Sequence, residues 1–118
     1  MKALITIAAV ALTAFAPAHA ALIAVEQAYE LNVAQIERWP LSDTGRLVIR
    51  TCRTCESIAL RVDAATRYRL GMGGAAVSRD ELVRLQATLN DRDGTHVFVF
   101  YRPDDGVATR IVLDIEER

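Results

Sequence analysis

Hydrophobic and polar residues alternate along much of the chain after residue 45, and this alternation predicts strands. The period is two residues, which is typical of a strand with one face buried and the other exposed. It runs through the segments 46–50, 58–62 and 68–70, and again through 107–115. The segment 96–101 is hydrophobic on both faces, which indicates a strand in the centre of a sheet or beneath a helix.

One helix is predicted between the third and fourth of these strands. Ser78 and Glu81 have the spacing of a capping box, in which the serine hydroxyl accepts from the Glu81 backbone N–H. In the same motif the Glu81 carboxylate accepts from the Ser78 backbone N–H. Leucines follow at helical spacing within 82–89, and the segment 90–94 (NDRDG) is expected to end the helix.

The segment 21–39 fits two patterns. Alternating hydrophobic and polar residues favour a strand, whereas the apolar residues between Ile23 and Ala34 also suit the spacing of a helix. We expect a strand over 29–36. A turn should follow it, marked by Pro40 and the sequence SDTG.

The predicted order is therefore strand, strand, strand, helix, strand, strand, with an extra strand in front. This order matches the OB-fold, a small five-stranded and partly open barrel whose helix lies between its third and fourth strands. We expect a mainly β chain with one helix, of the α+β class, folded as an OB-like partly open barrel. A two-layer α+β sandwich built from the same elements is the alternative.

The stretch from Asp63 to Ile115 also resembles the small exported bacterial OB-like domains of unknown function. In that pattern a strand D-x-x-T-x-Y leads into a short helix, followed by V-x-V-x-Y, a glycine turn and A-x-x-I-x-L. The matching residues here are Asp63, Thr66, Tyr68, Val97, Val99, Tyr101, Gly106, Ala108, Ile111 and Leu113. The resemblance implies a binding or structural module rather than an enzyme, and it implies no catalytic residue.

Residues 1–20 have the three parts of a secretory signal peptide. Lys2 supplies the positive charge, 3–15 form the apolar core, and small residues precede the expected cleavage point after Ala20. We expect a single small globular domain over 21–118, exported to the periplasm. No second apolar run of spanning length follows, so no membrane span is expected after cleavage.

Composition limits the classes of partner. The chain is 52% hydrophobic and 25% charged, which is ordinary for a globular domain. Apart from Lys2, its 13 arginines and 15 acidic residues leave a net charge of −2. This balance excludes a strongly basic nucleic-acid binder, and the composition excludes a disordered tail, a collagenous chain and a multidomain enzyme.

The only cysteines are Cys52 and Cys55, with two residues between them and a predicted strand on either side. In an exported protein an even number of cysteines favours a structural disulfide, here one that closes the turn. A redox role is the second interpretation, because neighbouring arginines would stabilise a thiolate. Metal binding is the third, since two thiolates suit soft Cu(I), whereas a tetrahedral zinc site needs four ligands.

Every basic residue after Lys2 is an arginine, and many of them occupy the face of a predicted strand opposite the core. Planar guanidinium groups on adjoining strands suit bidentate contacts with carboxylates or phosphates. The arginines on this face are Arg46, Arg50, Arg61, Arg67, Arg69, Arg102 and Arg110. A solvated surface paired with Asp and Glu is the simpler interpretation, and binding of an anionic envelope glycan or a protein partner is the more specific one. We expect no aromatic residue on this face to stack with bases, and therefore no nucleic acid as a partner.

No arrangement of residues predicts catalysis or a cofactor. His96 is the only histidine after residue 20 and is expected to be exposed, and the aspartates of 91–93 and 104–105 lie in turns where Asp bonds its own backbone. The glycine loop 71–74 lacks the pattern of a phosphate-binding loop. We therefore expect a periplasmic binding or structural module without catalytic residues, metal or cofactor. A thiol-redox or soft-metal protein that uses the cysteine pair is the alternative.

Overall fold

The computed structural model describes residues 25–115, which form a mainly β fold with one α-helix, as predicted. The predicted signal segment, residues 1–20, lies outside the described residues. The elements are β1 (Gln27–Asn32), the 3-10 helix η1 (Val33–Gln35), β2 (Ile36–Arg38), β3 (Arg46–Ile49), β4 (Ile58–Arg61), β5 (Arg67–Leu70), β6 (Ala76–Val77), α1 (Arg79–Ala87), β7 (His96–Arg102) and β8 (Val107–Leu113). No helix within 25–115 is long and apolar enough to cross a membrane.

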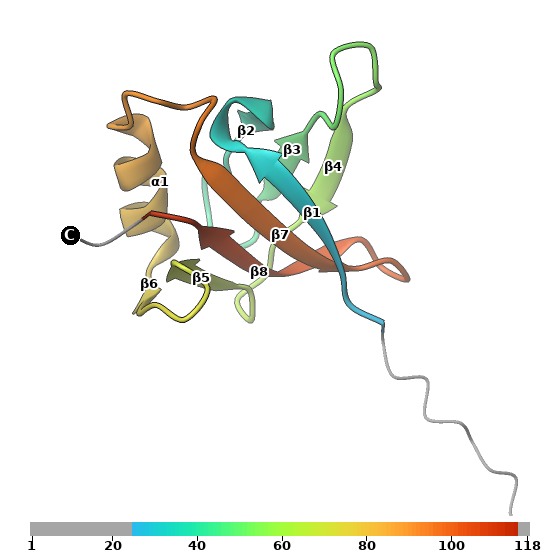
Figure 1. The fold of residues 1–118 in the computed structure, drawn as a ribbon. Helices are drawn as coiled ribbons and strands as arrows, with labels where there is room; N and C mark the ends of the chain where they lie inside the picture. Colours follow the sequence, from blue (N-terminus) through green and yellow to red (C-terminus); the bar gives the residue numbers. More distant parts are fainter. Residues whose placement is uncertain (1–24, 116–118) are drawn as a thin grey trace, which may run out of the picture.

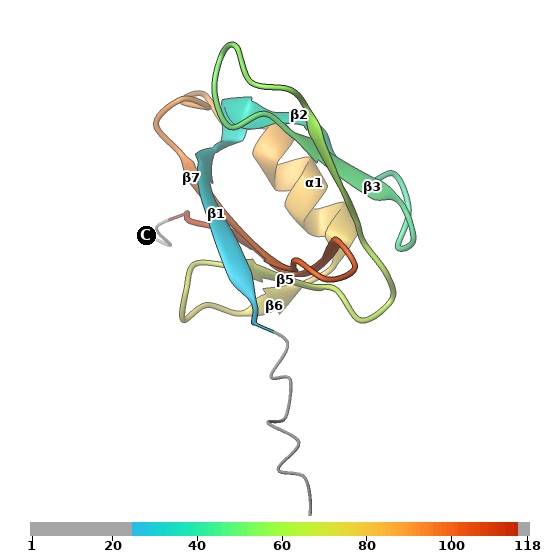
Figure 2. The same ribbon diagram turned by 90° about the vertical axis from the view of Figure 1, so that its right-hand side faces the viewer.

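The eight strands form one sheet in which β8 has a central place. Its main path runs in the order β1-β7-β8-β4-β3-β2, and β5 joins it by pairing with β8 while β6 adds to β5. β8 is antiparallel to β7 and parallel to both β4 and β5. The sheet curls around its inner face, and α1 lies across one end of the curl (Figures 1 and 2).

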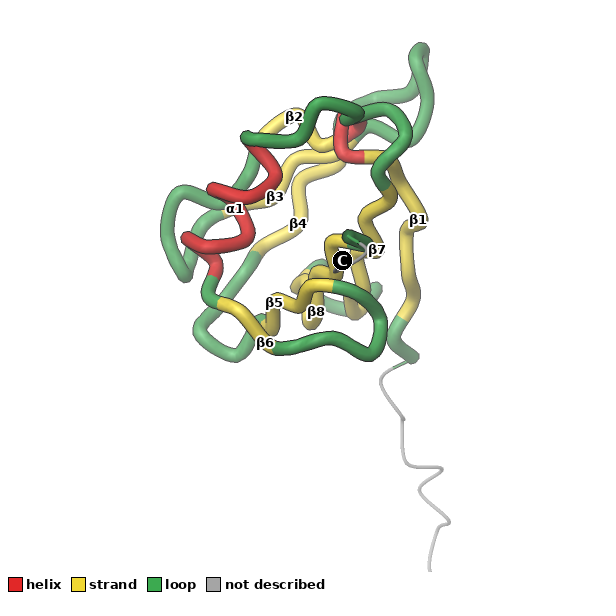
Figure 3. Tube along the Cα trace, turned by 60° about the vertical axis from the view of Figure 1, so that its left-hand side comes forward, coloured by secondary structure: helices red, strands yellow, loops and turns green. Residues whose placement is uncertain are grey.

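The strand expected over 29–36 is interrupted, because η1 separates β1 from β2 (Figure 3). The Gln35 N–H donates to Asn32 Oδ1 at 3.1 Å, and the Asn32 N–H donates to Gln35 Oε1 at 2.9 Å. Such side chain–backbone bonds compete with the ladder of a strand. As a result the chain changes partner at this point, with β1 pairing with β7 and β2 pairing with β3.

The other predicted elements are present with small shifts of their ends. β3, β4, β5, β7 and β8 match the five strands expected after residue 45, and β6 is a two-residue strand that the pattern did not predict. α1 begins where expected, with the Glu81 N–H donating to Ser78 Oγ at 3.1 Å. Of the two bonds of the expected capping box, this one is present, whereas the bond from the Ser78 N–H to the Glu81 carboxylate does not form among the described residues. The complete box in the described part of the chain is the one between Asn32 and Gln35.

The hydrophobic core fills the inside of the curled sheet. Alternate residues of β3, β7 and β8 point inward and are fully buried, and Leu82 of α1 reaches the same core. These inward residues are Leu47, Ile49, Val97, Val99, Ile111 and Leu113. In β3 and β7 the predicted alternation separates core positions from more exposed ones, whereas in β8 Ala108 and Val112 are buried as well.

Thr66 ties the connection between β4 and β5 to β8. Its buried hydroxyl donates to the Ala108 carbonyl at 2.7 Å and accepts from the Asp63 N–H at 3.0 Å. Asp63 Oδ1 in turn accepts from the Ala65 N–H at 2.9 Å. The connection is therefore held in one position relative to β8.

Replacing Thr66 with valine keeps the shape of the side chain but removes its hydroxyl. The Ala108 carbonyl and the Asp63 N–H would then lose their partner in a buried place, and we expect Thr66→Val to cost about 1–3 kcal/mol of unfolding free energy. Urea denaturation measures this loss. Thr88→Val is the matched control, because it removes an exposed hydroxyl that donates to the Leu85 carbonyl at 2.7 Å. Equal losses in the two variants would contradict the anchoring role of Thr66.

Candidate functional site

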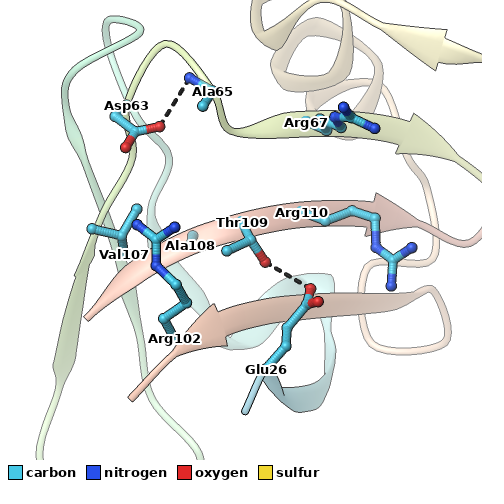
Figure 4. Close-up of a pocket in the computed structure, with 9 residues that line it drawn as sticks. All are labelled: Glu26, Asp63, Ala65, Arg67, Arg102, Val107, Ala108, Thr109 and Arg110. Carbon is cyan, nitrogen blue, oxygen red and sulfur yellow. Dashed lines mark hydrogen bonds between the residues drawn. The ribbon is translucent and has the colours of Figure 1, made fainter. Parts of the chain in front are cut away.

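A groove of about 290 Å³ lies on the outer side of the sheet, between the β4–β5 connection, β8 and the end of β7 (Figure 4). Five charged residues line it, namely Arg67, Arg102, Arg110, Glu26 and Asp63. Three of the arginines predicted to share a face therefore come together here, with two carboxylates among them.

Arg67 and Arg110 are direct neighbours in the sheet. They are register partners on the parallel strands β5 and β8. Like charges opposite each other on adjacent strands repel. Among residues 25–115 neither guanidinium forms an ion pair with a carboxylate. The two side chains thus present uncompensated positive charge at one side of the groove.

The ring of Phe100 fixes the position of Arg110. The guanidinium carbon lies 3.9 Å from the centroid of this ring, on the neighbouring strand β7. Its Nε is buried and has no hydrogen-bond partner within the described part of the chain. Stacking of this kind holds a guanidinium plane in place and leaves N–H groups at its edge for an anion.

A β-bulge in β8 brings Thr109 into the groove. Phe100 pairs with Arg110, but the next residue, Tyr101, pairs with Ala108, so Thr109 is the extra residue of the bulge. Its hydroxyl donates to Glu26 Oε1 at 2.7 Å (Figure 4). Strict alternation placed Thr109 on the core face with Ile111, and that placement is wrong because the bulge changes the alternation locally.

Arg102 is already neutralised at the other side of the groove. Its Nη2 lies 2.9 Å from Asp105 Oδ2, and its Nε donates to the same oxygen at 3.1 Å. The hydrogen bond from Arg102, followed by one from the Val107 N–H, holds the pKa of Asp105 below its ordinary value. The same contact raises the pKa of Arg102.

The remaining arginines of the predicted face are distributed around the curl. Arg46 and Arg61 are register partners on β3 and β4, and the Arg61 Nη2 donates to the Asp105 carbonyl at 3.3 Å. Arg69 follows Arg67 on β5 and donates to the Gly74 carbonyl at 3.3 Å. Because the sheet curls, the outer sides of β3 and β5 lie on different sides of the molecule (Figure 2).

Arg50 belongs to a separate cluster beside the cysteine loop. Its Nε forms an ion pair with Glu37, and its Nη2 donates to Ser57 Oγ at 3.3 Å. The Ser57 hydroxyl donates to the other oxygen of Glu37 at 2.7 Å. The hydrogen bond that Glu37 accepts from Ser57, followed by the one that it accepts from Arg50, lowers the pKa of Glu37. Arg50 is thus occupied by an acidic partner, as expected for a solvated surface.

The expectation of a face without aromatic residues is wrong. Phe98 and Phe100 pair in register with Val112 and Arg110, so they share the outer face with Arg110. Both rings are half-buried. The sequence left the faces of β7 undecided because the strand is hydrophobic on both sides. The ring of Phe100 is already covered by the Arg110 guanidinium.

Cys52 and Cys55 lie at disulfide distance, with their Cα atoms 5.0 Å apart. They occupy the loop between β3 and β4, where the Cys55 N–H donates to the Cys52 carbonyl at 3.2 Å. Cys52 is exposed and Cys55 is half-buried, and the chain continues into a strand rather than a helix. Within 25–115 no group of three or more His, Cys, Asp or Glu residues is placed to hold a metal ion.

The other polar residues singled out in the sequence serve local structure. His96 is exposed at the start of β7. Asp91 Oδ1 accepts from the Gly94 N–H at 2.9 Å, and Asp105 Oδ1 accepts from the Val107 N–H at 3.0 Å. These bonds are the turn interactions predicted for the two aspartate segments.

A second cavity, of about 330 Å³, lies beside the start of α1. Arg79 is held there by Asp43, at 3.2 Å, and by the Pro40 carbonyl, at 3.0 Å. The Tyr68 hydroxyl is buried without a hydrogen-bond partner among the described residues, and burial raises the pKa of Tyr68 to about 12. The hydroxyl therefore stays protonated at neutral pH.

We found no significant match to this chain among protein-family models, curated proteins or solved structures.

The ion pair between Arg102 and Asp105 predicts a pH dependence. In the folded chain the pKa of the Asp105 carboxyl lies below its ordinary 3.8. The ionised carboxylate therefore stabilises the fold fully above pH 3.8, and this stabilisation is lost as the pH falls through the folded pKa. We expect an NMR titration of the carboxyl to give a midpoint below 3.8, and Arg102→Gln to move the midpoint upward. Arg84→Gln, at an exposed helix position, is the control. Identical midpoints in the native chain and Arg102→Gln would disprove the coupling.

Proposed function

We propose that this chain is an exported, non-catalytic binding module that takes an anionic group of an envelope component in the groove beside β8. The observation that carries the proposal is the register pair of Arg67 and Arg110, whose guanidinium groups have no carboxylate partner within 25–115. A carboxylate or phosphate between them would relieve their repulsion and form charge-assisted hydrogen bonds. A carboxylate on a protein partner would use the same chemistry.

Strand pairing supports an OB-like architecture for the module. The segment β1–η1–β2 acts as one bent strand that pairs with β7 at one end and β3 at the other. β4 and β5 follow one another and both run parallel to β8. If β1–η1–β2 is counted as one strand and β4 with β5 as another, residues 25–115 contain five main strands, with α1 between the third and the fourth. This is the arrangement expected for an OB-like barrel.

Export to the periplasm is part of the proposal. Its support is the signal-like composition of residues 1–20 together with the cysteine pair at disulfide distance. Disulfides persist in oxidising compartments such as the bacterial periplasm.

Nucleic acid is a poor candidate for the ligand. The net charge after residue 20 is negative, and Glu26 and Asp63 line the groove itself. A phosphate backbone would bring repeated negative charges toward these carboxylates. The ring of Phe100 is occupied by Arg110 and so is not available for stacking with a base.

Replacing Arg67 and Arg110 together with alanine should abolish binding of an anionic envelope glycan. We expect at least a tenfold loss of retention on immobilised peptidoglycan, since two charge-assisted contacts disappear at once. Arg46→Ala with Arg84→Ala is the matched control, because it removes the same charge from exposed positions outside the groove. Retention that survives in the groove variant, with its thermal melt unchanged, would refute the proposed site.

We propose a structural role for the cysteine pair. It closes the exposed loop that carries Arg50, whose carbonyl accepts from Gln35 Nε2 at 3.3 Å. This contact connects the loop to the interruption between β1 and β2. No helix follows Cys55 that would stabilise a thiolate, in contrast to the usual place of a redox pair.

The reduction potential of the pair separates this role from a redox role. A structural bridge should have a potential below about −300 mV, measured by equilibration with thiol buffers. Cys52→Ser with Cys55→Ser should then lower the unfolding free energy by about 2 kcal/mol, because the closed loop is short. A potential between about −120 and −200 mV, with no change in stability, would favour thiol-redox chemistry instead.

A further inference from the structure

The groove presents both signs of charge in a definite arrangement. Arg67 and Arg110 supply positive charge at one side, and Glu26 and Asp63 supply two carboxylates along the rest of it (Figure 4). Arg102 adds little to this balance because it is paired with Asp105. A ligand that is negative throughout would therefore meet attraction at one side and repulsion at the other.

Each of the two carboxylates uses only one of its oxygens in hydrogen bonds with the described residues. Glu26 accepts from the Thr109 hydroxyl through Oε1, and Asp63 accepts from the Ala65 N–H through Oδ1. The other oxygen of each carboxylate accepts no hydrogen bond from residues 25–115. The protein contacts hold both groups in place, and the remaining oxygens are left for a donor on the ligand.

We infer that the groove binds a ligand with both a carboxylate and an ammonium group, such as a short peptide with free ends. Its carboxylate faces Arg67 and Arg110, and its ammonium group lies on the side of the groove that Glu26 and Asp63 line. This inference rests on the anion site of the proposed function and names the class of molecule that fits it. A volume of about 290 Å³ suits one or two amino-acid residues.

The arrangement also explains how the groove discriminates among anions. A zwitterionic ligand pairs with both signs of charge, whereas a polyphosphate or an acidic polysaccharide leaves two carboxylates without a cation and close to its own charges. Unpaired charge of this kind is a common source of specificity. Glu26 and Asp63 are therefore the residues that select the ligand, and Arg67 and Arg110 are those that any anion needs.

The test titrates the protein, by NMR, with alanyl-alanine, its N-acetyl and C-terminal amide derivatives, oligogalacturonate and inorganic polyphosphate. Alanyl-alanine should bind about tenfold or more tightly than either derivative, since each derivative lacks one charge-assisted contact. Its binding should also weaken as the pH rises above about 8, where a terminal amine loses its proton.

Glu26→Gln with Asp63→Asn is the decisive variant, because both amides keep the oxygen that the protein contacts use. This variant should bind alanyl-alanine no more tightly than it binds the N-acetyl derivative. It should also bind polyphosphate several-fold more tightly than the native chain does. Glu56→Gln with Asp104→Asn removes the same charge at exposed positions outside the groove and should change neither affinity.

The outcomes separate this inference from the proposed function. If oligogalacturonate binds more tightly than alanyl-alanine, depends on Arg67 and Arg110, and is unaffected by the Glu26 and Asp63 amides, the zwitterion inference is wrong and the anion site stands. If no probe binds, or if binding persists without Arg67 and Arg110, the proposed function fails as well.

Discussion

The hydrogen bonds of β8 are the constraint on which the rest of this structure depends. This strand pairs with β7 on one side and with β4 and β5 on the other. Parallel strands cannot be joined by a tight turn. The chain must therefore cross over between β5 and β8, and it does so through α1 and β7. The crossover places α1 across the end of the curled sheet, where Leu82 is buried in the core.

The same strand builds the groove. Ile111 and Leu113 of β8 face the core, while Thr109 and Arg110 line the outer side. The bulge at Thr109 and the stacking of Arg110 on Phe100 are therefore tied to the packing of the core. Side chains held on paired strands keep their geometry better than those on loops. A register shift in β8 would disturb the core and the charge arrangement together.

Much of the fold could be predicted from alternation because strand faces are encoded locally. The buried positions of β3, those of β8 from Ile111 onward on the core face, and the start of α1 at Ser78 were predicted correctly. The interruption at η1 was missed, since it depends on the two mutual hydrogen bonds of Asn32 and Gln35. The bulge was missed as well, because a bulge exists only relative to the partner strand.

By itself the sequence determined the strands after residue 45 apart from β6, which face of most of them is buried, and that the two cysteines are close. Each of these follows from neighbours in the chain. Only the tertiary structure decided that Arg67 and Arg110 lie side by side with Glu26 and Asp63, and that Arg46 and Arg50 lie elsewhere. Residues on different strands meet according to strand order, register and curl. Those are set by pairing between distant segments, which local alternation does not encode.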